Sequence, residues 1–229
     1  DGHDFVPAAL ERGAAAVMVG ADWLADHPVA QPTLAVTDTR RALGGIAAWW
    51  RNQFVLPLIG VTGSNGKTTV KEMAGAILAR TGSCLATQGN LNNHIGVFFF
   101  FFWLNAEHRI AIIEMGANKP GDIAELCAIA EPTYGLITNI GRAHLEGFGS
   151  LEGVAQGKGE MFAALGADDT AVINADDRFA AFWHGLAREA GRIVTFGMHE
   201  RADFTASNVA SRLSDTGFVT EFELSSPLG

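Results

Sequence analysis

A glycine-rich stretch, GVTGSNGKTT, carries the residue types of a phosphate-binding loop. Gly63 and Gly66 would let the backbone approach phosphate oxygens, with N–H groups facing the anion. Lys67 can reach the terminal phosphates, and the Thr68 hydroxyl can ligate Mg²⁺. The stretch departs by one position from the pattern G-x-x-x-x-G-K-[ST], because Val61 takes the place of the first glycine. The alternative is an ordinary strand-to-helix turn, but the G-K-T-T tetrad favours a variant phosphate-binding loop.

Two further side chains could hold a metal ion beside this loop. Glu114 ends the apolar run RIAIIEMG, and His144 follows the next apolar run in TNIGRAHLE. Ligands of open α/β sheets bind at the carboxyl ends of the strands, so both side chains are expected at the edge that holds the glycine loop. A surface glutamate and a packed or surface histidine are the simpler interpretations. The shared edge favours metal ligation by both.

The stretch LEGVAQGKGE is unusual for a helix because Gly157 and Gly159 flank Lys158, with Gly153 one turn earlier. Each glycine in a helix interior costs about 0.8–1 kcal/mol relative to alanine. Such a cost suggests that a group approaches the backbone closely or that the lysine needs room. From physical chemistry alone, a solvated surface lysine is the favoured interpretation.

These side chains require alternating strands and helices to bring them together. Short apolar runs predict strands at 14–20, 33–38, 56–64, 109–116, 134–141, 170–177 and 192–197. Helical spacing predicts helices at 39–54, 67–81, 120–130, 150–165 and 178–191. The alternation predicts an α/β fold, a mostly parallel sheet flanked by helices, with 202–224 as antiparallel strands added to it. We place a boundary between a small α/β unit, 1–54, and a larger unit, 55–229.

Bulk composition narrows the class of protein. The 229 residues are 48% hydrophobic and carry a formal net charge of −9, which argues against a general nucleic-acid binder. Cys84 and Cys127 give neither a disulfide framework nor metal-ligand spacing, so a cytoplasmic protein is expected. No signal peptide is expected, and the longest apolar run, 97–104, is far shorter than the ~20 residues of a membrane helix.

Five segments together resemble the ATP-dependent Mur ligases of peptidoglycan synthesis. They are GVTGSNGKTT, TQGNLNNHIGV, EMGANKPGDI, TNIGRAHLEGFGS and EGVAQGKGE. NLNNHIGV and EMGANKPGDI are most similar to the members that add D-Ala-D-Ala to UDP-N-acetylmuramoyl-tripeptide. The resemblance implies a P-loop-type central ATPase domain at 55–229, preceded at 1–54 by the C-terminal part of a UDP-substrate-binding domain. It also implies a monomer with ATP and Mg²⁺ as cofactors.

The reaction that the resemblance implies is amide-bond formation. ATP phosphorylates the terminal carboxylate of the tripeptide, and the amine of D-Ala-D-Ala then attacks the acyl phosphate. A carboxylate is a poor acyl donor, so phosphorylation supplies a leaving group, while Mg²⁺ and lysine offset the repulsion between anions.

The resemblance assigns roles to individual residues. Catalysis is implied for Lys67, Glu114, His144 and Lys158, and metal ligation for Thr68, Glu114, His144 and Lys158 as a carbamate. The implied nucleotide-binding set is Gly63, Ser64, Asn65, Gly66, Lys67, Thr68, Thr69 and Asn139. Asn90 and Asn93 are the implied substrate contacts.

The sequence departs from the family at two places. GVFFFFFWLN replaces a segment in which a proline usually follows Gly-Val, so the family pattern changes next to the implied substrate contact Asn93. A fully buried segment is its simplest interpretation, and an engineered or mis-assigned stretch is the alternative. We also expect a fragment, because the family's third domain, which brings the incoming dipeptide, has no counterpart in this sequence.

Other functions stay open at this point. One is a sibling ligase of the same superfamily, either an amino-acid-adding Mur ligase or a folylpolyglutamate- or cyanophycin-type enzyme. Another is an ATP-binding module without ligase activity. A kinase or GTPase is disfavoured because no base-reading motif is present.

Overall fold

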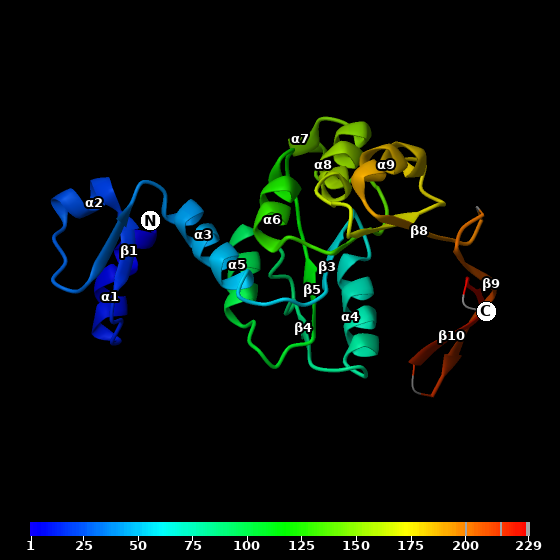
Figure 1. The fold of residues 1–229 in the computed structure, drawn as a ribbon, viewed down its shortest axis with the longest axis horizontal. Coiled ribbons are helices and arrows are strands. Elements are labelled where there is room, and N and C mark those ends of the chain that lie inside the picture. Colours follow the sequence, from blue (N-terminus) through cyan, green and yellow to red (C-terminus); the bar gives the residue numbers. More distant parts are fainter. Residues whose placement is uncertain (200, 216, 228–229) are drawn as a thin grey trace.

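Two sheets organise the chain, of which the computed structural model describes residues 1–199, 201–215 and 217–227 (Figure 1). The smaller sheet pairs β1 (Val17–Gly20) with β2 (Thr33–Val36) in parallel. The larger sheet has the strand order β10-β9-β8-β7-β6-β3-β5-β4. The small sheet lies apart from the large one, with α3 (Thr39–Arg51) between them.

The large sheet is parallel except at one end. Its strands are β3 (Leu58–Thr62), β4 (Cys84–Ala86), β5 (Ile110–Glu114), β6 (Tyr134–Ile137), β7 (Thr170–Asn174), β8 (Arg192–Gly197), β9 (Phe204–Ser214) and β10 (Gly217–Ser225). β9 and β10 form the antiparallel pair, and β9 joins β8 over a short parallel stretch. This confirms the predicted mostly parallel sheet and the antiparallel strands added to it.

Helices cover both faces of this sheet, with α4 on one side of the central strands and α6 on the other (Figure 1). The remaining helices are α1 (Val6–Glu11), α2 (Ala21–Asp26), α4 (Lys67–Leu78), α5 (His94–Phe102), α6 (Asp122–Ala130), α7 (Leu145–Phe148), α8 (Leu151–Ala163) and α9 (Ala180–Leu186). Two 3₁₀ turns, Gly2–Phe5 and Ala187–Glu189, complete the elements of the described residues. No helix in the described part of the chain is long and apolar enough to span a membrane.

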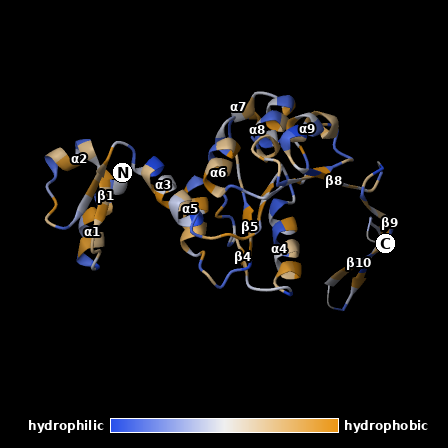
Figure 2. Ribbon diagram, viewed as in Figure 1, coloured by the Kyte–Doolittle hydropathy of each residue, from blue (hydrophilic) through white to orange (hydrophobic). Residues whose placement is uncertain are grey.

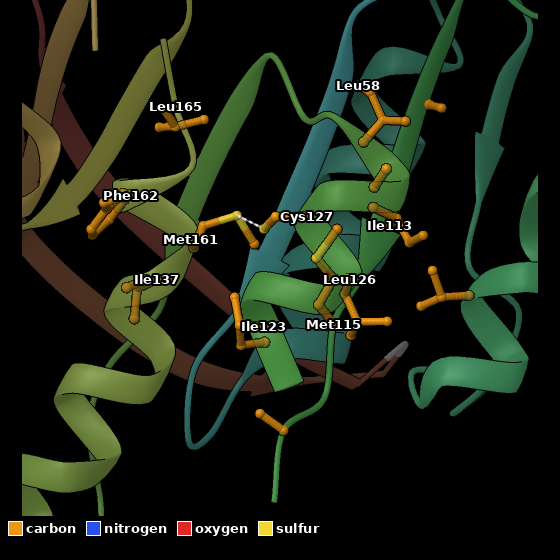
Figure 3. Close-up of a cluster of buried hydrophobic side chains, with 14 of the residues drawn as sticks. Leu58, Ile113, Met115, Ile123, Leu126, Cys127, Ile137, Met161, Phe162 and Leu165 are labelled. Carbon is orange, nitrogen blue, oxygen red and sulfur yellow. Dashed lines mark hydrogen bonds between the residues drawn. The ribbon is translucent and has the colours of Figure 1, made fainter. Parts of the chain in front are cut away.

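The core lies between the sheet and helices α6 and α8. The central strands are largely hydrophobic along their length (Figure 2). Figure 3 shows the buried cluster, which includes Leu58, Ile113, Met115, Ile123, Leu126, Cys127, Ile137, Met161, Phe162 and Leu165. Burial, with a smaller effect of the Glu160 charge, raises the pKa of the Cys127 thiol to about 12. The thiol therefore behaves as a small apolar group in this core.

Helix α3 is fastened to the larger unit. It packs against α5 and α6, and Arg51 at its end is 7% exposed. The Arg51 guanidinium donates from Nε to the Ala130 carbonyl at 2.7 Å and from Nη2 to the Glu131 carbonyl at 3.1 Å. Trp50 Nε1 donates to the Leu104 carbonyl at 3.0 Å. The helix ends at Arg51, short of the predicted 54, and these bonds hold its C-terminal turn in place.

The phenylalanine run forms α5, an element that the sequence patterns did not assign. Phe98, Phe100 and Phe101 are buried, whereas Phe99 is 48% exposed. A helix directs the side chains of a continuous apolar run toward every side, so some rings must face outward. The interpretation of a fully buried segment is therefore wrong at Phe99 and at Trp103, which is 42% exposed.

Candidate active site

The predicted site residues meet at the carboxyl edge of the large sheet. β3 lies between β5 and β6, and the strand order reverses at this point. Such a reversal leaves a crevice in open parallel sheets. The glycine loop follows β3, Glu114 ends β5, and residues 138–141 follow β6, so all three segments border that crevice.

The glycine loop needs glycine at two positions. Gly63 has φ +141°, and a Cβ there would lie 2.0 Å from Thr138 Oγ1. Gly66 has φ +76° and is the N-cap of α4, so its backbone is also in a region that favours glycine. Val61 is a fully buried strand residue that pairs with Glu114. The glycine missing from the usual pattern therefore falls inside β3, before the loop begins.

Residues after β6 brace the loop from outside. Ser64 N–H donates to the Asn139 carbonyl at 2.8 Å, and Asn65 N–H donates to Asn139 Oδ1 at 3.2 Å. The Thr138 hydroxyl donates to the Asn65 carbonyl at 2.6 Å. The loop conformation is thus fixed by the protein itself.

Glu114 connects α4, the helix that follows the glycine loop, to the segment after β4. Its carboxylate accepts from the Thr68 hydroxyl at 2.8 Å and from Asn92 Nδ2 at 2.7 Å, and the residue is 1% exposed. A hydroxyl and a carboxylate are hard oxygen ligands of the kind that Mg²⁺ prefers, so the pair fits this cation. Within the described residues, no three His, Cys, Asp or Glu side chains gather as a metal cluster.

A small pocket of about 170 Å³ opens beside this pair. Its lining includes Lys67, Asn92, Asn93, His144 and Lys158. Lys67 Nζ donates to the Gly63 carbonyl at 3.0 Å, and His144 caps α7 with a left-handed φ of +56°. The structure therefore brings the two lysines and the histidine of the prediction to one cavity.

Lys158 is buried, so the interpretation as a surface lysine is wrong. It is 1% exposed, and its amine lies 5.9 Å from the centre of the Phe148 ring. Burial, with a smaller effect of the Lys67 charge, lowers the pKa of Lys158 to about 8. Such a lowered pKa in a pocket is typical of functional lysines.

The glycines of α8 are explained by close packing. A Cβ on Gly157 would lie 2.3 Å from the Phe148 ring, and one on Gly153 would lie 2.1 Å from the Phe148 carbonyl oxygen. A Cβ on Gly159 would lie 2.5 Å from Leu186 Cδ1. These glycines let α7 and α9 approach α8, and the first contact brings the Phe148 ring toward Lys158.

The remaining predicted residues have less direct positions. Thr69 and Asn90 are exposed, and Asn90 does not line the small pocket. Asn93 lines the pocket, and its side chain accepts from Gly96 N–H at 2.8 Å as the N-cap of α5. Asn139 contacts the loop backbone.

Sequence reasoning missed several pocket residues, namely Asn92, His94, Asn118 and Asp122. Asn92 stands between the chosen Asn90 and Asn93, and only the Glu114 contact distinguishes it. His94 Nε2 is buried and lies 3.1 Å from Glu125 Oε2, outside hydrogen-bond geometry.

A second, larger hollow of about 500 Å³ adjoins the other side of the loop. Its lining is mainly apolar and includes Val70, Leu136, Val172, Val194 and Phe196. A flat ring fits such a surface well. The hollow is therefore suited to the base of a nucleotide whose phosphates lie on the loop.

A third hollow, about 700 Å³, lies elsewhere, between α6 and α8. Thr133 and Asp169, which precede β6 and β7, are among its lining residues. It therefore opens at the amino ends of the strands, and we do not assign the active site to it.

Comparisons with known proteins agree with this geometry. Residues 61–228 match the family model described as the Mur ligase middle domain. The UDP-N-acetylmuramoyl-tripeptide–D-alanyl-D-alanine ligase of Escherichia coli K12 is 42% identical over 231 residues, which is 100% of this chain and 49% of that protein. The Bacillus subtilis 168 ligase of the same name is 38% identical over 224 residues, or 96% and 47% of the two chains.

Solved structures are similar over the same extent. A crystal structure of MurF from Acinetobacter baumannii superimposes with a TM-score of 0.90 at 35% identity, covering 100% of this chain and 48% of that one. MurF ligase from Thermotoga maritima in complex with ADP gives 0.80 at 29% identity, covering 97% and 52%. The chain spans about half the length of the curated relatives it matches.

Proposed function

Because the chain belongs to the Mur ligase family, we propose that it is the nucleotide-binding part of an ATP-dependent, ADP-forming ligase. The ligase would join D-alanyl-D-alanine to UDP-N-acetylmuramoyl-tripeptide during peptidoglycan precursor synthesis. One observation carries the proposal. A braced glycine loop places Lys67 and the Thr68–Glu114 pair beside the small pocket that holds Lys158.

ATP would lie across the loop, with its phosphates toward the small pocket and its base in the apolar hollow. Exposed N–H groups at the start of α4 and the Lys67 amine would bind the phosphate oxygens. To do so, Lys67 would exchange its 3.0 Å contact with the Gly63 carbonyl for a phosphate oxygen. The ADP complex of the Thermotoga maritima enzyme, a structural neighbour, supports a nucleotide site on this fold.

Thr68 and Glu114 would hold Mg²⁺, together with His144 from across the pocket. When bound, the cation would offset the negative charge of the phosphates. Lys158 would act as a further ligand after its neutral amine bonds to the carbon of CO₂ and loses a proton. The resulting carbamate is an anion, which suits a buried position beside Lys67 better than a second ammonium group does.

The carboxylate of the tripeptide would enter the small pocket and receive the γ-phosphoryl group. Lys67 would stabilise the negative charge that develops during the transfer. The walls formed by Asn93 and the residues around it would exclude water from the acyl phosphate. Asn90 would contact the substrate outside this pocket.

We assign residues 1–54 to the C-terminal part of a UDP-substrate-binding domain and 55–229 to the central ATP-binding domain. The two separate sheets support this division, as does the start of the family match at residue 61. We further propose a monomer located in the cytoplasm, where ATP and UDP-linked precursors are found. Size-exclusion chromatography with light scattering would test the monomer.

Calorimetric titration with Mg-ATP tests the proposal directly. We expect micromolar binding by the chain, lost in Lys67→Ala and kept in the control Lys119→Ala, which removes an exposed lysine. Protection from thermal unfolding by UDP-N-acetylmuramoyl-tripeptide, and not by a folate, would favour this ligase over its folate-linked relatives. A folded chain that binds no nucleotide would contradict the proposal.

A further inference from the structure

Lys71 is a buried lysine for which the proposed function gives no role. It lies on α4, one helical turn after Lys67, and its side chain is 0% exposed. Burying an ammonium group costs free energy unless hydrogen bonds and an anion compensate. Among the described residues, Glu72 is the one carboxylate in an ion pair with it, and that side chain is 65% exposed. An aliphatic residue would fill the space without this cost, so the amine itself must have a use.

The Lys71 amine holds the end of β4. It donates to the Thr87 carbonyl at 2.6 Å, and Thr87, 2% exposed, follows directly after the strand. The Thr87 N–H still pairs with the Ile112 carbonyl on β5 at 3.1 Å. A buried carbonyl at the point where a strand leaves its sheet needs a donor. Lys71 provides it and so ties the end of β4 to the phosphate-binding helix.

Thr87 in turn holds Glu114. The Glu114 N–H donates to the Thr87 side-chain oxygen Oγ1 at 2.9 Å. This side chain takes the place of a backbone carbonyl, because β4 has already ended at Ala86. The chain then runs from Thr87 to Asn92, which donates to one carboxylate oxygen of Glu114 at 2.7 Å. The other oxygen accepts from Thr68 at 2.8 Å. Segment 87–92 therefore restrains Glu114 at both its backbone and its carboxylate, and Lys71 fixes the first residue of that segment.

We propose that Lys71 is a positioning residue of the nucleotide–metal site. By holding Thr87 against α4, it sets Glu114 and Asn92 at the correct distance from Thr68. The inference rests on the proposed function, because this distance matters most if Thr68 and Glu114 share a cation. Residues that orient metal ligands typically change metal affinity when they are replaced.

Lys71→Met separates this role from simple packing, because it removes the donor and keeps most of the apolar stem. Calorimetry would measure ATP binding over a series of Mg²⁺ concentrations and again in EDTA. We expect the Mg²⁺ concentration for half-maximal enhancement of binding to rise about tenfold. Binding in EDTA should stay within about twofold of the wild type, because Lys67 and the loop N–H groups are unchanged. Circular dichroism would establish that the variant is folded.

Two further variants sharpen the test. Glu72→Gln removes the exposed partner of Lys71 but not the Thr87 contact, so its Mg²⁺ response should match the wild type. Thr87→Val removes the acceptor of the Glu114 N–H and should shift the Mg²⁺ response in the same direction as Lys71→Met. The double variant Lys71→Met/Thr87→Val should be no worse than the stronger single variant, because both act through one chain of contacts.

The results distinguish the two proposals. If the wild type binds ATP with a clear Mg²⁺ dependence and Lys71→Met keeps that dependence, the inference fails while the proposed function stands. Equal losses with Mg²⁺ and in EDTA would show a purely structural lysine and would also overturn the inference. If the wild type binds no Mg-ATP, the proposed function fails and the inference fails with it.

Discussion

Replacing Lys158 with methionine should stabilise the chain near neutral pH, although the lysine is central to the proposed activity. The side chain is 1% exposed. Burial, and to a smaller extent the positive charge of Lys67, lowers its pKa from 10.5 to about 8. Methionine keeps most of the apolar stem but has no ammonium group for folding to desolvate.

The magnitude follows from the change in proton affinity. A fall in pKa from 10.5 to about 8 corresponds to about 3 kcal/mol at 1.36 kcal/mol per pKa unit. Loss of the amine's contact with the Phe148 ring offsets about 1 kcal/mol of this. We therefore expect the free energy of unfolding to rise by about 2 kcal/mol at pH 7.

The pH dependence has a definite sign. Below pH 8 the amine is protonated in both the folded and the unfolded chain. The folded chain then bears the whole cost of burying the ammonium group, about 3 kcal/mol. Between pH 8 and 10.5 the folded chain releases the proton while the unfolded chain keeps it, so wild-type stability rises relative to the variant. The advantage of Lys158→Met should therefore shrink toward zero or below by about pH 10.5.

Urea unfolding at the two pH values measures this difference. Trp183, fully buried and hydrogen-bonded to the Ala155 carbonyl of α8, provides a fluorescence signal close to the substitution. The buffers must be free of CO₂, because a carbamate would replace the ammonium group. Lys119→Met, at an exposed lysine, should change stability by less than about 0.5 kcal/mol. Lower stability of Lys158→Met at pH 7, or a gain that does not shrink at high pH, would refute the reasoning.

Three further substitutions or treatments test other parts of the structure. Gly63→Ala should weaken Mg-ATP binding about tenfold or more in calorimetry, because the φ of residue 63 is +141° and the new Cβ would lie 2.0 Å from Thr138 Oγ1. Unchanged affinity would contradict this loop geometry. At pH 8, iodoacetamide should alkylate half-buried Cys84 in the native chain, although burial raises the pKa of this thiol too. Cys127, 3% exposed and with its pKa raised to about 12, should react only at urea concentrations that unfold the chain, and equal rates in mass spectrometry would contradict its burial. Phe99→Gln should reduce aggregation measured by light scattering, because it removes a ring that is 48% exposed. For the same reason it should change the free energy of unfolding by less than about 1 kcal/mol, and a larger loss would place the ring in the core.

The sheet was predictable because its strands are short, apolar and separated by helical patterns. β4 was not, since it has three residues, Cys84–Ala86, and no alternation can be recognised over that length. α5 was missed for the opposite reason, because a continuous apolar run lacks any period. The packing of Phe98, Phe100 and Phe101 into the core, together with the Asn93 N-cap, determines its conformation.

The site was predictable where strand ends determine position. Glu114 and the loop lie together because parallel strands share one carboxyl edge. Burial of Lys158 was not predictable from local sequence, since Phe148 and the approach of α7 create it. The contact of Asn92 with Glu114 likewise depends on where segment 87–92 crosses β5, which no spacing in the sequence encodes.

The departure of the loop from the usual pattern now has a structural reason. The phosphate-facing turn begins at Gly63, one position after β3 ends, and its shape is set by bonds from Thr138 and Asn139. A first glycine two positions earlier would lie within the buried strand, where Val61 fills the core and pairs with Glu114. Valine there strengthens the strand that aligns the loop with its carboxylate partner, and it takes no space from the phosphates. The loop therefore does not need the missing glycine, because hydrogen bonds from the segment after β6 fix its backbone. These bonds organise the loop before a nucleotide binds.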